Sequence, residues 1–323
     1  MVSSKQLKRE LAGAAVAVLL SAVAFCSATY AWFVSNNTVT AKTSTISATT
    51  NGFILQIATL EQGAQHGGEQ SSLAASLEGG KITPSSTNDL KTWYACRGWR
   101  TDGKVTSYAQ LNFDPDHPGK YSAGGDDHYA FLKSEFIVYT ISETGFADVY
   151  FAPKDDNPVQ VTVDEAPTTD TVPKSLRVGI TTESVDGNGK GKGDETLKVV
   201  YAPYEVSGKG NDAAAVDGWS CIRPVESTGV LAPGKPTYSY IQAGIFVDSS
   251  SHDWAAAKSG QDDYAAPADN PSAIAQKVGY NGVIVRIYIW MEGTDADCVN
   301  NAAAEDTATY NVSVKFAGVA AGD

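Results

Sequence analysis

The chain has 323 residues, enough for one large domain or two modest ones and enough to bury a core without disulfide support. Hydrophobic residues make up 42%, so the composition is that of a folded protein and excludes a disordered chain. Lys and Arg number 24 against 37 Asp and Glu, a formal net charge of −13. Such a surface repels a phosphate backbone, which excludes general nucleic-acid binding.

The first 31 residues follow the order of a secretory signal: a basic region, an apolar run from Leu11 to Phe25, and then small residues. The basic residues are Lys5, Lys8 and Arg9. We therefore predict export to the cell surface or the medium, with a signal peptidase as a partner. Removal of residues 1–31 takes away three basic residues and one acidic residue, which leaves 21 against 36 and a net charge of −15. That charge does not suit binding to anionic lipid.

The cleavage site is predicted from its small residues. Cleavage after Ala31 places Thr29 and Ala31 at the two positions where the peptidase prefers small side chains, and makes Trp32 the first residue of the mature chain. Cleavage after Ala28 or Ala24 is compatible with the same rule. The apolar stretch of about 24 residues is also long enough to span a bilayer if it stays uncut. An uncleaved membrane anchor is therefore the alternative.

Three cysteines remain in the mature chain, Cys96, Cys221 and Cys298. Their number is odd, and no two are close enough in sequence for a C-x-x-C metal or redox motif. One long-range disulfide with one free thiol, or three buried thiols, are both compatible with export.

Runs rich in β-branched and aromatic residues recur after the signal, with turn signals between them. In residues 310–316 the apolar side chains alternate strictly with polar ones, the pattern of a half-buried antiparallel strand. Residues 283–290 are apolar on both faces except at Arg286, which predicts a central strand covered on both sides. The predicted strands are 38–47, 52–59, 136–142, 148–152, 159–163, 176–182, 197–202, 238–247, 283–291 and 309–316.

Helical patterns are scarce, and only residues 71–77 and 272–278 suggest short helices. About ten strands with long loops predict an all-β fold, a jelly-roll-like antiparallel β-sandwich formed by residues 49–323. A donor-type strand segment, residues 32–48, and the signal, residues 1–31, precede it. The long loops are 61–88, 201–235 and 249–270, and such loops are often functional.

No catalytic motif is present. The sequence contains no H-E-x-x-H, no G-x-S-x-G, no Walker loop and no dinucleotide-binding fingerprint, and the cysteines lack thiol-protease signatures. We therefore predict that the protein is not an enzyme and needs no cofactor.

Two segments are weak metal candidates. Asp114, Asp116, His117 and His128 offer carboxylates and imidazoles, but the surrounding prolines and glycines favour a solvated turn. Residues 186–195 faintly resemble a calcium loop, but a lysine stands at the fifth position, so a glycine-rich connection between two strands is the favoured interpretation.

Aromatic residues gather in residues 93–108, next to basic ones. A sugar- or partner-binding face is one interpretation. Packing in the core is the favoured one, because aromatic residues are ordinary in strands. The residues concerned are Trp93, Tyr94, Trp99 and Tyr108, around Cys96, Arg97 and Arg100.

Residues 29–41 read T-Y-A-W-F-V-S-N-N-T-V-T-A, and residues 44–48 read S-T-I-S-A. This stretch resembles the cleavage junction and first strand of the TasA/camelysin family of exported proteins of Gram-positive bacteria. The resemblance implies a jelly-roll domain, cleavage by a dedicated signal peptidase, and a role as a biofilm-matrix fibre subunit in which the N-terminal segment of one subunit adds as a strand to the next. Residues 285–298 are similar to an I-W-L-E-G-x-D-P-x-C segment of uncharacterised surface proteins of gut Gram-positive bacteria, which implies no activity. A peptidase activity is not carried over from camelysin, because the zincin motif is absent.

The segment after the predicted cleavage site is rich in Thr and Val, which favour strands. Alternation places its side chains on two faces with little difference in polarity, so its register is loosely specified. It can pair with the sheet edge of another subunit or within its own domain, since both use the same main-chain bonds. One face holds Val39, Ala41, Thr43 and Thr45, and the other holds Thr38, Thr40, Lys42, Ser44 and Ile46.

Three functions follow in order of preference. The first is a structural subunit or accessory of an extracellular fibre, whose partners are further copies or related matrix subunits. Head-to-tail addition of a strand from one subunit to the next does not form a closed ring, so it produces filaments. The second is a monomeric surface adhesin or glycan-binding module, anchored through the uncleaved N-terminal helix. The third, an exported hydrolase, ranks well behind.

Overall fold

In the computed structural model the described part of the chain has an all-β fold. The structure describes residues 39–50, 55–60, 72–76, 81–99, 105–123, 125–141, 145–163, 172–204, 222–224, 231–233, 240, 243–249, 254–258, 264–267, 273–293, 295, 298 and 309–321. No helix among these residues is long and apolar enough to cross a membrane.

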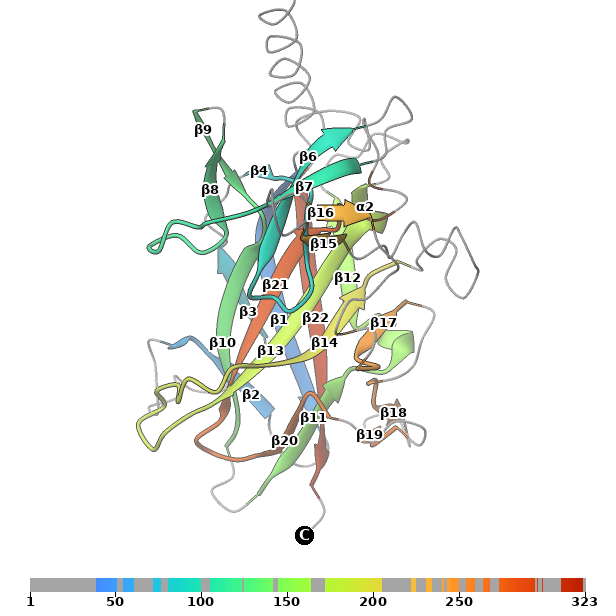
Figure 1. Cartoon of the computed structure of the whole chain (residues 1–323). Coiled ribbons are helices and arrows are strands. Elements are labelled where there is room, and N and C mark those ends of the chain that lie inside the picture. The colour runs from blue at the N-terminus through green and yellow to red at the C-terminus, as the bar shows by residue number, and fades with distance from the viewer. Residues whose placement is uncertain are drawn as a thin grey trace, which may run out of the picture.

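Two large sheets form the body of the molecule (Figure 1). Within the described residues, sheet A runs β20-β11-β22-β1-β4-β9-β8, with β12 also paired to β22 and β3 to β1. Its strands are β1 (Val39–Thr50), β3 (Ser72–Ser76), β4 (Lys81–Ile82), β8 (Lys120–Ala123), β9 (Asp126–Tyr129), β11 (Ala147–Phe151), β12 (Val159–Val163), β20 (Ala275–Val278) and β22 (Thr309–Ala320). Sheet B runs β17-β14-β13-β21-β10-β2. Its strands are β2 (Leu55–Ala58), β10 (Leu132–Thr140), β13 (Leu176–Ser184), β14 (Thr196–Ala202), β17 (Phe246–Asp248) and β21 (Val283–Met291).

Smaller elements complete the described structure. A third sheet, sheet C, consists of β5 (Ser85–Thr87), β6 (Trp93–Trp99) and β7 (Val105–Gln110). Two ribbons pair β15 (Ile222–Pro224) with β16 (Leu231–Pro233) and β18 (Ala257–Lys258) with β19 (Tyr264–Ala265). The helical elements are the 3₁₀ turn η2 (Lys154–Asp156) and the single-turn helix α2 (Val172–Ser175).

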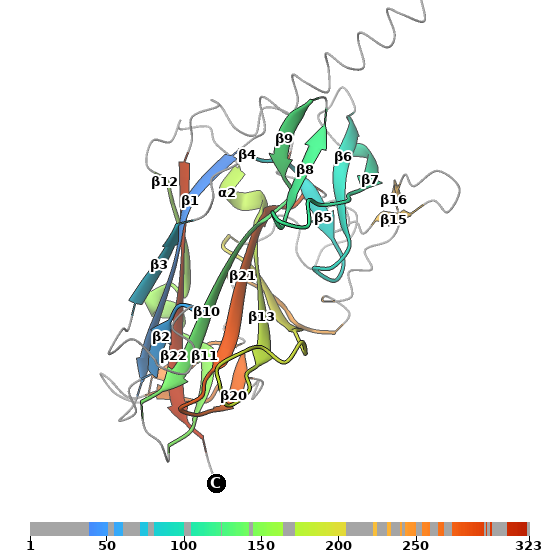
Figure 2. The same cartoon turned by 90° about the vertical axis from the view of Figure 1, so that its left-hand side faces the viewer.

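The main core lies between sheets A and B, which face each other in Figure 2. Alternate residues of β21, from Val285 to Met291, point into it, and so do Val312, Val314 and Phe316 of β22. The period-2 pattern predicted for β22 is therefore confirmed, because the residues between these three are only half-buried.

A second core covers the outer face of sheet B. Trp290 and Tyr288 of β21 point into it, where the Trp290 ring lies edge-on to Trp93 of sheet C at a centroid distance of 5.5 Å. Trp93 in turn stacks on Phe131 at 4.4 Å. The prediction that residues 283–290 form a central strand covered on both faces is thus confirmed.

Several predictions about elements are wrong. The two short helices expected at 71–77 and 272–278 are instead strands β3 and β20, paired with β1 and β11. Segments this short do not sustain a helix alone, and pairing with a neighbouring strand overrides weak helix propensity. The strand expected at 238–247 begins only at Phe246. The sandwich is also not purely antiparallel, since β1 and β22, β14 and β17, and β4 and β9 pair in parallel.

Candidate functional site

Strand β1 is the candidate assembly site, and it lies inside sheet A. It pairs in parallel with β22 from Thr40 opposite Thr309 to Thr50 opposite Gly318. On its other side it pairs antiparallel with β3 and, at Val39, with β4. Figures 1 and 2 both show β1 and β22 side by side along the sandwich. The chain's first described strand is therefore held next to its last one.

The predicted assembly residues Val39, Ala41, Thr43, Thr45 and Ile46 all lie in β1, which pairs with β22 less regularly than the predicted alternation assumed. The register with β22 shifts between Ala41 and Thr43. After the shift, the positions opposite the buried Val312, Val314 and Phe316 are Ser44, Ile46 and Ala48. A local irregularity of this kind changes which residues occupy equivalent positions along a strand. The predicted cleavage residues Thr29, Ala31 and Trp32 lie outside the described residues.

The metal candidates are distributed over a turn and a strand. Asp114 and His117 form an isolated bridge, and the amide of Asp116 donates to Asp114 Oδ1 at 2.9 Å, as in an Asx turn. His128 is buried in β9, with Nε2 3.2 Å from the Ala123 carbonyl oxygen. Among the described residues, no three His, Cys, Asp or Glu side chains lie close enough to share a metal ion. The glycine-rich residues 186–195 connect β13 to its antiparallel neighbour β14.

A charged cluster on the outer face of sheet B was not predicted. Arg286 contacts Glu135 of β10 at 2.5 Å, Glu183 of β13 at 2.5 Å, and Glu195, which precedes β14, at 3.5 Å. Tyr288 donates to Glu195 at 2.9 Å. Burial alone would lower the pKa of Arg286, but the surrounding carboxylates raise it. The single charge of Arg286 in an otherwise apolar strand was the feature of the sequence that could have indicated this cluster. In the structure, Arg286 links three strands of sheet B.

A second set of unpredicted contacts, an ion pair and two hydrogen bonds, gives the segment 285–298 a structural role. Arg177 of β13 forms a buried ion pair with Asp295. Trp290 Nε1 donates to Glu292 Oε2 at 3.0 Å, and the Glu292 amide donates to the carbonyl oxygen of Ser175 at 2.8 Å. The motif therefore joins the end of β21 to the start of β13.

Cys298 ends this motif and is a buried free thiol. Burial raises its pKa, and the neighbouring Asp295 and Glu292 raise it further. A thiol in this state is a poor nucleophile. The side chains of Cys96 and Cys221 lie outside the described part of the chain, as do those of Trp99 and Tyr108, whereas Trp93 is in the core.

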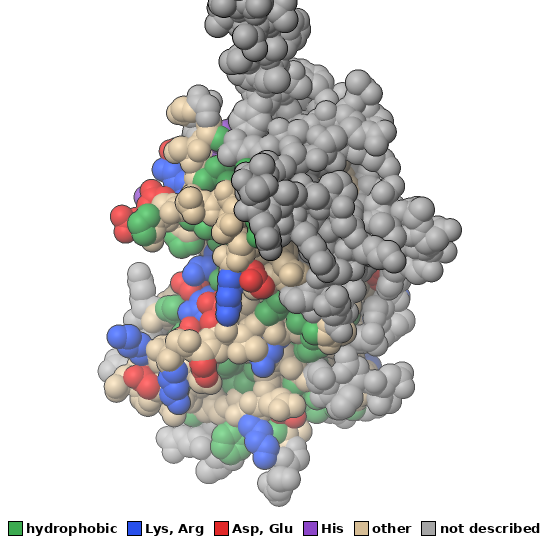
Figure 3. All heavy atoms as spheres, viewed as in Figure 1, with side chains coloured by type: hydrophobic (Ala, Val, Ile, Leu, Met, Phe, Trp, Pro, Cys, Tyr) green, Lys and Arg blue, Asp and Glu red, His purple; other side chains and the backbone are tan. Residues whose placement is uncertain are grey.

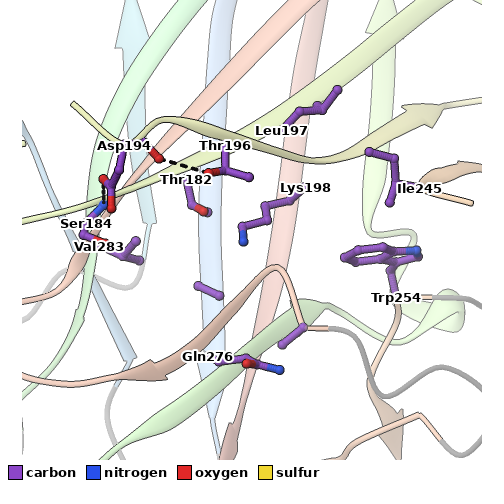
Figure 4. Close-up of a pocket in the computed structure, with 12 residues that line it drawn as sticks. Thr182, Ser184, Asp194, Thr196, Leu197, Lys198, Ile245, Trp254, Gln276 and Val283 are labelled. Atoms are coloured by element: carbon purple, nitrogen blue, oxygen red, sulfur yellow. Dashed lines mark hydrogen bonds between the residues drawn. The ribbon is translucent and has the colours of Figure 1, made fainter. Parts of the chain in front are cut away.

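A polar hollow lies between sheet B and β20, with a volume of about 530 Å³ (Figure 4). Trp254 closes one end, and Lys198 extends between Thr182 and Gln276. Trp254 is buried, has a left-handed backbone with φ of 69°, and no partner for its Nε1 exists among the described residues.

Comparisons with known proteins assign neither a family nor a function to the chain. No family model matches the chain, and neither a curated protein nor a solved structure matches it. The function must therefore be argued from the chain's own residues.

Proposed function

We propose that this protein is an exported structural protein, a subunit or accessory of an extracellular fibre, that assembles by donating β1 to a neighbouring copy. The observation that carries the proposal is the position of β1. It is the chain's first described strand, it sits inside sheet A, and it pairs in parallel with β22.

A parallel neighbour cannot be joined to β1 by a hairpin. The chain continues from the end of β1 through residues 51–54 to β2, which belongs to the other sheet. Strand β1 is thus held in sheet A by main-chain pairing on both sides and by one short link at its C-terminal end. The same bonds form when an identical strand arrives from another copy, which is the physical basis of strand exchange.

The proposal extends to fold and location. We propose a jelly-roll-like β-sandwich, cleavage between Ala31 and Trp32, and a non-enzymatic role in the matrix or at the cell surface, in line with the resemblance of residues 29–48 to TasA/camelysin proteins. Its partners are further copies of the chain or related matrix subunits.

The first test is electron microscopy of the mature chain, Trp32 to Asp323, beside a chain that starts at Thr49. We expect filaments from the first and none from the second. Compact single particles from both would contradict the fibre role.

The second test keeps the whole mature chain and asks where β1 is paired. Thr45 lies opposite Ser313 in the β1–β22 register, and adjacent strands bring such residues to within disulfide reach. Under oxidation, the T45C/S313C double variant forms a disulfide within one chain if β1 is paired in its own chain. If β1 is donated, the disulfide joins two chains and produces covalent multimers. We expect multimers after assembly on non-reducing gels, and only monomers from either single variant.

A glycan-binding module is the second candidate, and the hollow beside Trp254 is the observation that favours it. Its threonine hydroxyls and the Gln276 amide are groups that bind sugars. It ranks second because Trp254 is only 5% exposed, which leaves little of the ring for a sugar to stack on. Saturable binding of a glycan by a monomeric chain, abolished by Gln276→Ala, would favour it over the fibre subunit.

A further inference from the structure

Most of the exposed large hydrophobic side chains among the described residues lie at one end of the molecule. Among the described residues, four are exposed, and three of these are Ile141 at 37%, Phe146 at 51% and Tyr280 at 41%. These three residues, called the end patch below, belong to the turns that follow β10, precede β11 and join β20 to β21. Figure 3 shows hydrophobic side chains at the lower end of the molecule.

Contacts between the turns make the end patch continuous. The amide of Thr140, next to Ile141, donates to the carbonyl oxygen of Gly279 at 3.1 Å. Gly279 lies directly against the ring of Phe146, since a Cβ added there would be 2.9 Å from Phe146 Cε1. Tyr280 follows Gly279 in the chain. The three residues therefore lie at one junction of two turns.

The end patch lies next to the point where β1 ends. Thr50, the last residue of β1, is opposite Gly318 of β22. Three residues further along the chain, the amide of Ala321 donates to the carbonyl oxygen of Phe146 at 3.0 Å. At about 3.3 Å per residue, Phe146 lies about 10 Å beyond the end of β1.

The start of β2 lies at the same end. Leu55 pairs with Thr140, the neighbour of Ile141. Four residues separate Thr50 from Leu55, so the two Cα atoms can be at most about 18 Å apart even when the link is fully extended. If β1 is donated, the donor's Thr50 takes the place opposite the acceptor's Gly318, and the donor's Leu55 must stay within about 18 Å of that place.

We propose that the end patch is the docking surface for a second copy of this chain, and that copies which exchange β1 meet by this same end. The inference rests on the proposed strand exchange and adds the surface of contact. The short link keeps the donor's Ile141 within reach of the acceptor's Phe146, and a contact between them removes apolar surface from water that a free chain exposes. Reciprocal exchange across this junction closes a dimer, whereas a filament requires that each copy donate β1 to one neighbour and accept β1 from another.

The test uses the mature T45C/S313C chain with changes in the end patch. Tyr280→Ser and Phe146→Ser each remove apolar surface from the junction. If Phe146→Ser does not fold, because Phe146 contacts Gly279, the Tyr280→Ser variant still tests the junction. Tyr204→Ser is the matched control. Tyr204 is 38% exposed, but it follows β14 at the opposite end, where Tyr201 pairs with Val178 near the start of β13. The melting temperature of each monomer shows whether it is folded.

We expect both end-patch variants to form intermolecular disulfides at least tenfold more slowly than the parent, and the Tyr204→Ser variant to match the parent. Equal rates in all folded variants would overturn the end patch as the junction while leaving strand exchange intact. Monomeric cross-links in the parent under every condition would overturn the strand exchange, and the junction with it. Dimers without longer multimers would support the junction and contradict the fibre.

Discussion

The two sheets are built around central strands of opposite character. In sheet B, β21 is apolar on both faces and is buried on both, with residues such as Ile287 inside the sandwich and Trp290 in the second core. In sheet A, β1 lies in an equally interior position, yet Val39 and Ile46 are its only large apolar residues. A central place in a sheet therefore does not require a hydrophobic strand, because the main-chain ladder supplies much of the affinity.

The difference extends to how each strand is fixed. Side chains anchor β21 through the Arg286 cluster and through Trp290, which donates to Glu292. Strand β1 is held by pairing along its length and by its link to β2. The main-chain pairing of β1 can also form with the same strand of another copy, and the described side chains of β21 add an anchor of their own.

The largest predicted effect comes from removing β1. A chain that starts at Thr49 lacks Val39 to Ala48, so β22 loses its neighbour on the β1 side from Thr309 to Phe316 and keeps only β12 and β11 on its other side. Loss of about ten hydrogen bonds at about 1 kcal/mol each is comparable to the whole stability of a domain, about 5–15 kcal/mol. We expect this chain to lose cooperative thermal unfolding, measured by circular dichroism.

A synthetic peptide of residues 38–50 should restore unfolding cooperativity, with a melting temperature that rises with peptide concentration. The same peptide with Ile46→Pro is the control, since proline cannot donate to the ladder. An unchanged melting temperature after truncation would show that β1 contributes little to the stability of sheet A. Strand β1 would then not be a central strand of its sheet in the sense that β21 is.

The next effect concerns the buried pair that fixes sheet B. Arg177 and Asp295 have side chains only 3% and 1% exposed. Arg177→Met leaves the Asp295 carboxylate buried without its partner, so we expect a loss of about 3–5 kcal/mol in the free energy of unfolding, measured in urea. The double variant R177M/D295L should recover at least half of that loss. Equal losses in the single and double variants would mean that packing around Arg177, and not the charge pair, stabilises this corner.

Sequence patterns predicted the strands that have a strong periodicity. They predicted little of how the strands pair or of which side chains connect them. Strands β21 and β22 followed from their apolar patterns, and Arg286 stood out as the one charge in an apolar run. Its partners Glu135 and Glu183 are more than 100 residues away, and only the strand order β13-β21-β10 brings them together. The register shift in β1 and the pairing of β20 with β11 depend on neighbouring strands in the same way, so local sequence could not reveal them.

The smallest predicted effect is a pH dependence at the outer face of β21. Burial alone would raise the pKa of Glu135, but its bonds to Arg286 and Lys133 lower it below the ordinary value of 4.5. A lowered carboxyl pKa contributes stability above the ordinary value, and this stability is lost as the pH falls through the folded-state pKa. Because Glu135 is one-third exposed, its contribution should be below about 1 kcal/mol.

We therefore expect Glu135→Gln to be less stable than the parent at pH 7 and equal to it at acid pH, by urea unfolding across that range. Asp155→Asn, at an exposed position of η2, controls for the general loss of negative charge. A gap between Glu135→Gln and the parent that stays constant with pH would mean that the glutamate acts through packing. In that case side-chain charge would not anchor β21 at Glu135, and the contrast with β1 would rest on the hydrophobic faces of β21 and on the Arg177–Asp295 pair.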